Sequence, residues 1–128
     1  MAYPPGLLPA RSWMRIMNGL ADHFGDNAEL DAGTMTEITQ LLLDGSADAS
    51  SYRRSRQVMR SLPAQATPVR IMDVPFIRHE HDEIPERLVV PNPDVKSLAN
   101  CSACHPRAAQ GSFAERDIRI PGYGNWDD

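Results

Sequence analysis

The sequence has few aromatic side chains and few stretches free of helix-breaking residues. Phe, Trp and Tyr make up only 6% of its 128 residues, whereas 11 residues are proline and 8 are glycine. A hydrophobic fraction of 41%, together with segments of helical periodicity, favours a globular protein over a disordered chain. Because aromatic core material is scarce, a buried apolar cofactor would supply part of the core.

The sequence also lacks the charge pattern of proteins that bind nucleic acids or anionic membranes. The formal net charge is −4, and Lys96 is the only lysine among 13 basic residues. No apolar run is long enough to cross a bilayer, so we expect no transmembrane segment. The first residues do not have the basic, apolar and small-residue regions of a secretory signal.

Three segments of the first half have apolar residues at helical spacing. The first occupies residues 9–25 and places His23 in its last turn. The second occupies residues 34–45 and begins with Thr34, whose spacing to Glu37 matches a capping box. Its expected apolar face consists of Met35, Ile38, Leu41 and Leu42. The third helix runs from about residue 51 to residue 62.

Proline divides the rest of the chain, since eight of the 11 prolines lie at or after position 63. Long regular elements cannot form there. We expect one short helix at about 75–82, another from Ser97 into the cysteine motif, and loops elsewhere. The predicted organisation is a helical N-terminal part, residues 1–62, followed by a second lobe, residues 63–128.

Both cysteines of the chain lie in the motif Cys101-Ser102-Ala103-Cys104-His105. C-x-x-C-H is the signal for covalent haem attachment. One helical turn separates the two thiols, which matches the two vinyl groups on one edge of a porphyrin. The adjacent histidine then reaches the iron. We predict haem c, with thioethers at Cys101 and Cys104 and with His105 as the proximal ligand.

Two other interpretations of the motif remain open. Two cysteines and a histidine supply three zinc ligands, which would make the chain a zinc-stabilised structural module, with His79 or His81 completing the set. Adjacent residues such as Cys104 and His105 are, however, awkward as two corners of one tetrahedron. A thioredoxin-like dithiol expects a βαβ context, which this helical and proline-rich sequence does not provide.

The sixth iron ligand must come from upstream of the motif, because residues 106–128 contain neither Met nor His. His79 and His81 are the nearest histidines. Being two residues apart on a short helix, they face different ways, so at most one reaches the iron. Met72 and His23 are the other candidates. If none of them reaches the iron, the chain is an open-site haem sensor or a peroxidase-like protein.

The chain resembles the bacterial dihaem cytochrome c family over nearly its whole length. The segments that carry this resemblance are Pro5-Gly6-Leu7-Leu8-Pro9-Ala10-Arg11-Ser12-Trp13, Asp22-His23-Phe24-Gly25-Asp26-Asn27-Ala28, Arg53-Arg54-Ser55-Arg56, His81-Asp82-Glu83-Ile84-Pro85, Asn100-Cys101-Ser102-Ala103-Cys104-His105-Pro106 and Ile118-Arg119-Ile120-Pro121. Together they are far more specific than the haem motif alone.

The resemblance implies two haems, each with histidine on both axial faces. It implies that His105 is proximal, that His81 rather than His79 is its distal partner, and that His23 is a ligand of the other haem. The family has its first C-x-x-C-H just before the stretch that matches Tyr3 onward. We therefore expect this sequence to hold one covalent haem, and a second only if a preceding segment is present.

The resemblance also implies one-electron transfer in the periplasm, with other cytochromes as partners. These are small monohaem oxygen-binding cytochromes and membrane b-type cytochromes. The expected fold is mainly α, a small cytochrome c-like domain of short helices and proline-rich loops around the haem. The expected function is that of a low-potential electron carrier and not of an enzyme, because two histidine ligands leave the iron no open site. The third helix contributes a cluster of Arg53, Arg54, Arg56 and Arg60, which could bind haem propionates, steer an acidic partner or simply be solvated.

Overall fold

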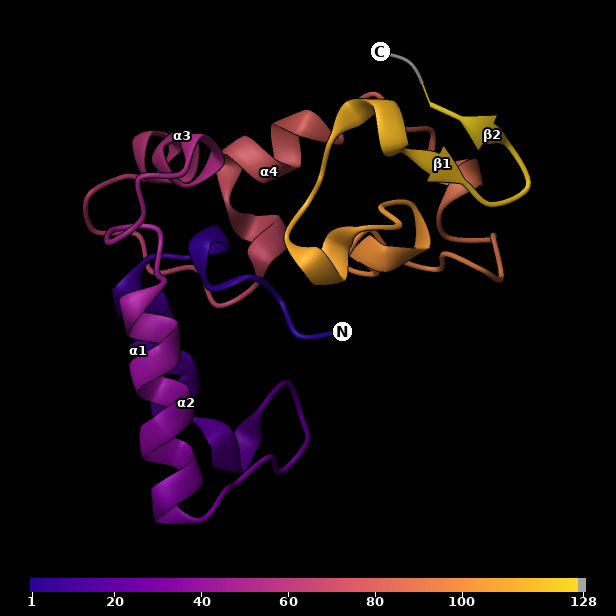
Figure 1. The fold of residues 1–128 in the computed structure, drawn as a ribbon. Helices are drawn as coiled ribbons and strands as arrows, with labels where there is room; N and C mark the ends of the chain where they lie inside the picture. The colour runs from indigo at the N-terminus through magenta and orange to yellow at the C-terminus, as the bar shows by residue number, and fades with distance from the viewer. Residues whose placement is uncertain (127–128) are drawn as a thin grey trace. The chain divides into compact units, whose positions relative to one another are not determined.

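The computed structural model describes residues 1–126 (Figure 1). This part of the chain is mainly helical with little strand, as predicted. The α-helices are α1 (Ala10–Asn18), α2 (Ala32–Asp44), α3 (Arg53–Ser61) and α4 (Pro75–Glu80). Seven 3-10 turns of three residues each link them: Pro5–Leu7, Leu20–Asp22, Ile71–Asp73, Glu86–Leu88, Cys101–Ala103, Ala108–Gln110 and Glu115–Asp117. Two short antiparallel strands, β1 (Arg119–Ile120) and β2 (Gly124–Asn125), follow.

The chain forms two compact units. The helical unit is Pro5–Ile77, and the motif unit joins Met1–Pro4 to the chain from Arg78 onward. The predicted lobes, 1–62 and 63–128, rest on the helical periodicity and on the proline content of the sequence, and that division stays a prediction. No helix within residues 1–126 is long and apolar enough to span a membrane.

Helix α1 is shorter than its periodicity predicts. Pro9, with an extended backbone, precedes it, and Gly19 ends it after Asn18. The chain continues as the 3-10 turn Leu20–Asp22. The prediction that His23 lies in the last turn of this helix is therefore wrong, because the glycine ends the helix four residues before the histidine.

Helix α2 begins earlier than predicted. Asp31 is its N-cap and accepts hydrogen bonds from the backbone N–H and the hydroxyl of Thr34, at 2.9 and 2.7 Å. The capping box at Thr34 is thus wrong, because the helix already begins three residues earlier, where Asp31 accepts from the Thr34 N–H. The predicted apolar face is only partly correct: Leu42 packs on the core, whereas Leu41 is 63% exposed and Ile38 is also exposed.

The helical unit has a contiguous apolar core that includes Leu8, Trp13, Ala47, Val58 and Val74. Leu8 and Val58 are fully buried, and each such side chain stabilises the unit by about 1.5–3 kcal/mol relative to an exposed one. Gly6 allows the chain to approach α3 closely. A Cβ on Gly6 would lie 2.6 Å from the hydroxyl oxygen of Ser55, which donates a 2.9 Å hydrogen bond to the Gly6 carbonyl.

The motif unit consists mostly of turns. Its buried apolar side chains are small or medium in size, namely Val89, Val95, Ala108 and Ile120. The Asn92 side chain links two loops by donating to the carbonyls of Leu88 and Pro121, at 3.2 and 2.8 Å. The helix predicted at 75–82 is present as α4. The helix predicted from Ser97 is absent, because bends and turns lead instead into the single 3-10 turn Cys101–Ala103.

Candidate haem site

The C-x-x-C-H motif forms one tight turn. The backbone N–H groups of Cys104 and His105 both donate to the carbonyl of Cys101, at 3.2 and 2.8 Å. Both cysteines and the histidine are half-buried. A single turn therefore carries the two sulfurs and the imidazole that covalent haem attachment requires.

The motif turn is fixed from three sides within its own unit. The backbone N–H of Arg119, in β1, donates to the Cys104 carbonyl at 3.0 Å. The Asn100 side chain donates to the Val95 carbonyl at 3.2 Å. The Tyr3 hydroxyl donates to the carbonyl of Ala99 at 2.8 Å, which brings the N-terminal residues beside the motif. Sequence reasoning missed Tyr3 as a neighbour of the haem motif, because 96 residues separate it from Ala99.

The thiols of the motif lie in a partly buried setting. Burial raises the pKa of the Cys101 thiol, and burial followed by the charge of Cys101 raises the pKa of the Cys104 thiol. Reactive dithiols have a lowered thiol pKa, which is the opposite direction. Across residues 1–126, no three His, Cys, Asp or Glu side chains come together as a metal-binding group.

His81 lies opposite His105. It follows α4 at the start of a turn in which the Ile84 N–H donates to the His81 carbonyl at 3.2 Å. The imidazole ring centres of His81 and His105 are 6.2 Å apart, and their planes cross at 72°. His79 points elsewhere: its side chain is 82% exposed, and its Nδ1 lies 3.6 Å from a carboxylate oxygen of Asp82.

The spacing of His81 and His105 fits a haem iron between them. Metal–imidazole bonds are about 2.0–2.1 Å long and the ring centre lies roughly one ångström beyond the nitrogen, so two axial imidazoles have ring centres about 6 Å apart. The observed 6.2 Å agrees with this value. A separate cavity of about 460 Å³ is lined by Cys104, Pro106 and residues 119–124 among others, and neither His81 nor His105 lines it.

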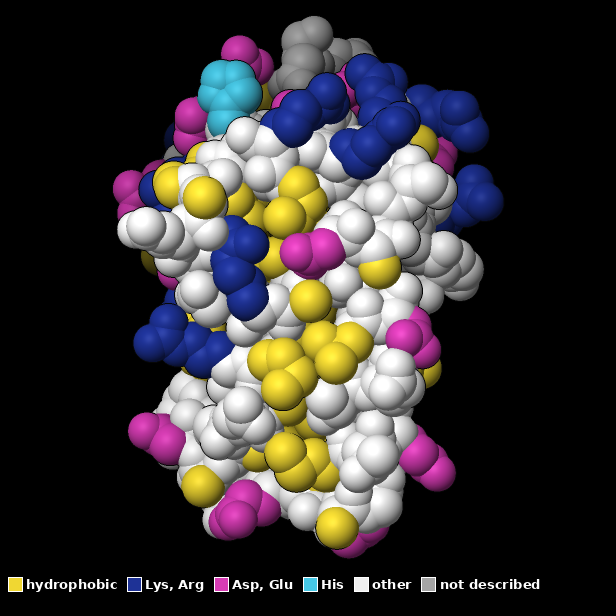
Figure 2. Space-filling view, turned by 90° about the vertical axis from the view of Figure 1, so that its left-hand side faces the viewer, with side chains coloured by type: hydrophobic (Ala, Val, Ile, Leu, Met, Phe, Trp, Pro, Cys, Tyr) yellow, Lys and Arg dark blue, Asp and Glu magenta, His cyan; other side chains and the backbone are white. Residues whose placement is uncertain are grey.

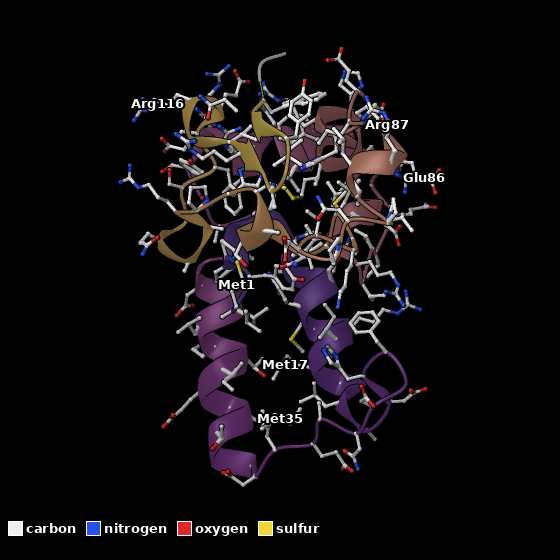
Figure 3. All side chains as sticks on the ribbon, turned by 90° about the vertical axis from the view of Figure 1, so that its right-hand side faces the viewer. Met1, Met17, Met35, Glu86, Arg87 and Arg116 are labelled. Carbon is white, nitrogen blue, oxygen red and sulfur yellow. The ribbon has the colours of Figure 1, made fainter. Side chains whose placement is uncertain are left out.

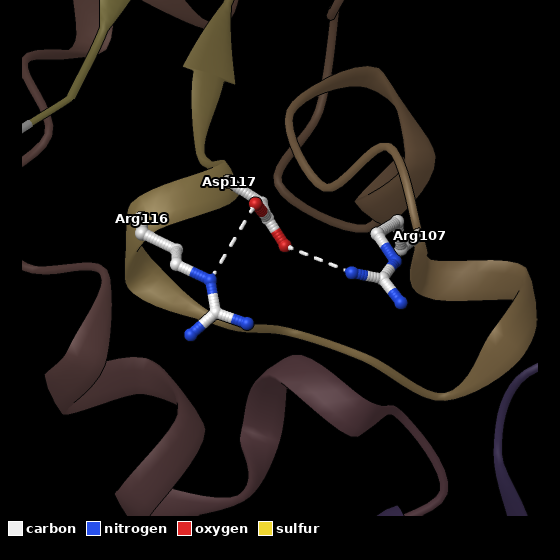
Figure 4. A network of polar contacts seen from close by, with 3 residues as sticks. All are labelled: Arg107, Arg116 and Asp117. Atoms are coloured by element: carbon white, nitrogen blue, oxygen red, sulfur yellow. Dashed lines mark ion pairs between the residues drawn. The ribbon is translucent and has the colours of Figure 1, made fainter.

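The loop after the motif carries a small network of charges (Figure 4). Asp117 lies 3.8 Å from a guanidinium nitrogen of Arg107 and 4.0 Å from Nε of Arg116. Both arginines are largely exposed, so these ion pairs contribute little stability. Their geometric effect is that the segment 107–117 closes on itself beside His105.

His23 occupies a second and different setting. It begins a tight turn in which its N–H donates to the Asp26 carbonyl at 2.7 Å. Phe24 has a φ of 53°, which is rare for a bulky residue and marks backbone strain. The Phe24 ring meets the His23 ring edge-on, with centres 4.6 Å apart, and the Arg70 guanidinium lies 4.5 Å from the Phe24 ring centre.

The helical unit also exposes apolar side chains near this turn and along the helix pair. Met14, Phe24, Leu30, Ile38 and Leu41 are all exposed. Figure 3 shows Met17 of α1 and Met35 of α2 directed toward the space between these two helices. His23 is the only histidine of this unit, and Met72, the rival ligand for the motif haem, belongs to the same unit. The unit that contains His23 thus also exposes several large apolar side chains.

The fold and the C-x-x-C-H motif together define the class of protein to which this chain belongs. A mainly helical chain with both cysteines and a histidine on one C-x-x-C-H turn is a c-type cytochrome, and its cofactor is haem c.

Comparison with known proteins then gives the family. The profile of the dihaem cytochrome c family matches residues 1–113, and the chain belongs to this family, as the sequence predicts. It is 38% identical to the dihaem cytochrome c of Shewanella baltica OS155, with a TM-score of 0.79, covering 99% of this chain and 88% of that one. It is 39% identical to the dihaem cytochrome c of Rhodobacter sphaeroides, with a TM-score of 0.77, covering 88% of this chain and 86% of that one. The search of curated proteins found no match.

Proposed function

We propose that this chain is a periplasmic one-electron carrier whose motif haem has His105 and His81 as its two axial ligands. The observation that supports this most directly is the 6.2 Å separation of the two imidazole ring centres. The exposure of His79 supports the choice of His81. Haem attachment through thioethers takes place outside the cytoplasm, which supports the periplasm as the location.

Each residue of the site has a distinct role in this proposal. Cys101 and Cys104 would attach the cofactor through thioether bonds. His105 and His81 would supply the two imidazole ligands of the iron. When bound, the haem supplies a one-electron couple. With an imidazole on each face, the two side chains exclude other ligands and favour a low reduction potential, below that of Met/His cytochromes.

His23 is proposed as a ligand of the family's other haem. The sequence contains one C-x-x-C-H, so this chain provides thioether bonds for one haem only. The strained turn that carries His23 and the exposed apolar side chains of α1 and α2 support a haem site there. A second haem would need its attachment motif from a segment preceding Tyr3.

The proposed partners are other cytochromes, either a small monohaem oxygen-binding cytochrome or a membrane b-type cytochrome. Charge is segregated in the helical unit: residues 16–52 contain seven Asp and Glu and no Lys or Arg, whereas residues 53–72 contain five Arg and no acid. Figure 2 shows Lys and Arg in the upper and middle parts of one face, and only Asp and Glu among the charged side chains of its lower part. Such separation steers a charged partner.

The proposal is tested by producing the chain with a cytochrome c maturation system. We expect the mass of the polypeptide plus one haem and a low-spin absorption spectrum in both oxidation states. Carbon monoxide on the reduced protein and cyanide on the oxidised protein distinguish the carrier from an open-site sensor or peroxidase. Rapid binding of either ligand would contradict the double-histidine site, and a colourless, zinc-containing product would contradict the haem.

A further inference from the structure

Phe113 contacts the ring of His105 from the side. The ring centres are 5.2 Å apart and the planes meet at 67°, an edge-to-face arrangement that aromatic pairs prefer. The His105 ring also lies 6.2 Å from the His81 ring, with their planes crossed at 72°. One imidazole therefore has both Phe113 and the second imidazole as ring neighbours.

We infer that Phe113 is a positioning residue that holds the His105 imidazole crosswise to the His81 imidazole. This inference rests on the proposed double-histidine site and specifies how that site is oriented. A histidine ring rotates easily about its χ2 bond, because this torsion has no sharp staggered minima. The plane of an axial imidazole is therefore set by its neighbours, and groups around a metal ligand commonly fix its orientation in this way.

The chain returns Phe113 to His105 through a closed loop. The Ala108 N–H donates to the His105 carbonyl at 3.1 Å, and the Ser112 N–H donates to the Arg107 carbonyl at 3.1 Å. Gly111, with a φ of 79°, makes the reversal between them. Beyond Phe113, the ion pair between Asp117 and Arg107 ties the far end of the loop to the residues that follow the motif.

The angle between two axial imidazole planes has a spectroscopic signature in a ferric low-spin haem. Parallel planes separate the energies of the two iron d orbitals that interact with the imidazoles, which gives a rhombic electron paramagnetic resonance spectrum. Crossed planes make these orbitals nearly equal in energy, which gives one feature at an unusually large g value. The structure therefore predicts the large-g spectrum for the motif haem of this chain.

The test uses the ferric holoprotein in frozen solution. We expect the wild type to give the large-g signal, Phe113→Leu to shift intensity toward a rhombic signal, and Phe113→Tyr, which keeps the ring, to retain the wild-type spectrum. Tyr52→Leu is the control, because Tyr52 is an exposed aromatic residue of the helical unit and lies outside the motif unit. It should leave the spectrum unchanged.

The outcomes separate this inference from the proposed function. A high-spin signal in the wild type would contradict the double-histidine site itself. A low-spin but rhombic wild-type signal would leave that site intact and overturn the crossed orientation. An unchanged spectrum in Phe113→Leu would overturn the role of Phe113. If Phe113→Leu gives no holoprotein, Phe113→Met decides that role by the same shift, and the wild-type spectrum decides the orientation independently.

Discussion

His105 and His23 have similar immediate neighbours but lie in units built differently. Each imidazole meets a phenylalanine ring edge-on, with centres 5.2 Å apart for His105 and 4.6 Å apart for His23. His105, however, lies among turns and small buried side chains, whereas His23 belongs to a unit with three long helices and a contiguous core. We expect the helical unit to fold by means of its own apolar core, and the motif unit to need a haem as core material.

The largest expected effect comes from removing the haem attachment, and it tests this difference directly. In Cys101→Ala/Cys104→Ala, covalent haem should be lost completely, as measured by mass and by the absorption spectrum. Because α1, α2 and α3 all lie in the helical unit, most of the far-ultraviolet helical signal should remain. Limited proteolysis should then cleave the motif unit first. Equal loss of protection in both units would show that the helical unit also depends on this haem.

Substitutions of His81 and His79 test which of these two histidines is the second ligand of the motif haem. His81→Ala should open one face of the iron, so that carbon monoxide binds the reduced protein rapidly, and His81→Met should raise the reduction potential. His79→Ala is the matched control, because its exposed side chain contacts only Asp82 among the interactions described for it. Its spectrum and its potential should match the wild type. If His79→Ala bound carbon monoxide and His81→Ala did not, His79 would be the iron ligand and His81 would not.

The core of the helical unit can be weakened without touching the haem. Leu8→Ala removes a fully buried side chain and should lower the free energy of unfolding of this unit by about 2–5 kcal/mol. The absorption spectrum of the native protein should not change. Leu41→Ala is the control, since Leu41 is 63% exposed and its truncation should have little effect. The free energies of unfolding are measured by chemical denaturation. A similar decrease in both variants would mean that Leu41 of α2 is packed and not exposed.

The arginine stripe of α3 tests the charge segregation of the helical unit. Arg53, Arg56 and Arg60 are exposed and lie at helical spacing on one face of α3, without ion pairs to any residue that the structure describes. Changing all three to Gln should slow electron transfer with an acidic partner cytochrome severalfold at low salt. The difference should shrink as salt screens the charges. If the electron-transfer rate changed neither with the substitutions nor with salt, the arginine face of α3 would not be the docking surface.

The sequence predicts a c-type cytochrome because the chemistry of the haem motif is local. Five consecutive residues carry both sulfurs and the imidazole proposed as the proximal ligand, and the proposed distal histidine lies within one short segment of the chain. The contacts of Tyr3 and Phe113 could not be predicted in this way. One depends on a backbone partner 96 residues away, and the other on a reversal at Gly111 that periodicity does not reveal.

Helix boundaries illustrate the same limit in the helical unit. Apolar spacing continues through Gly19, so periodicity extends the first helix to His23, whereas the backbone ends it at the glycine. In α2, the spacing of Thr34 and Glu37 matches a capping box, but Asp31 is the actual N-cap. Residue spacing alone does not show which of two possible residues caps a helix. The hydrogen bonds that each one makes decide between them.

The smallest expected effect concerns the N-cap of α2. It tests whether Asp31 or Thr34 caps this helix. Asp31→Ala should lower the melting temperature of the helical unit slightly, whereas Glu37→Ala, which would break a capping box, should not. Hydrogen bonds from the backbone and the hydroxyl of Thr34 lower the pKa of Asp31 below its ordinary value of 3.8. A carboxyl whose pKa is lower in the folded state stabilises the protein above its unfolded pKa, and this contribution is lost as the pH falls through the folded pKa. The difference between wild type and Asp31→Ala should therefore be constant near neutral pH and decline only in strong acid. A larger loss in Glu37→Ala would restore Thr34 as the cap.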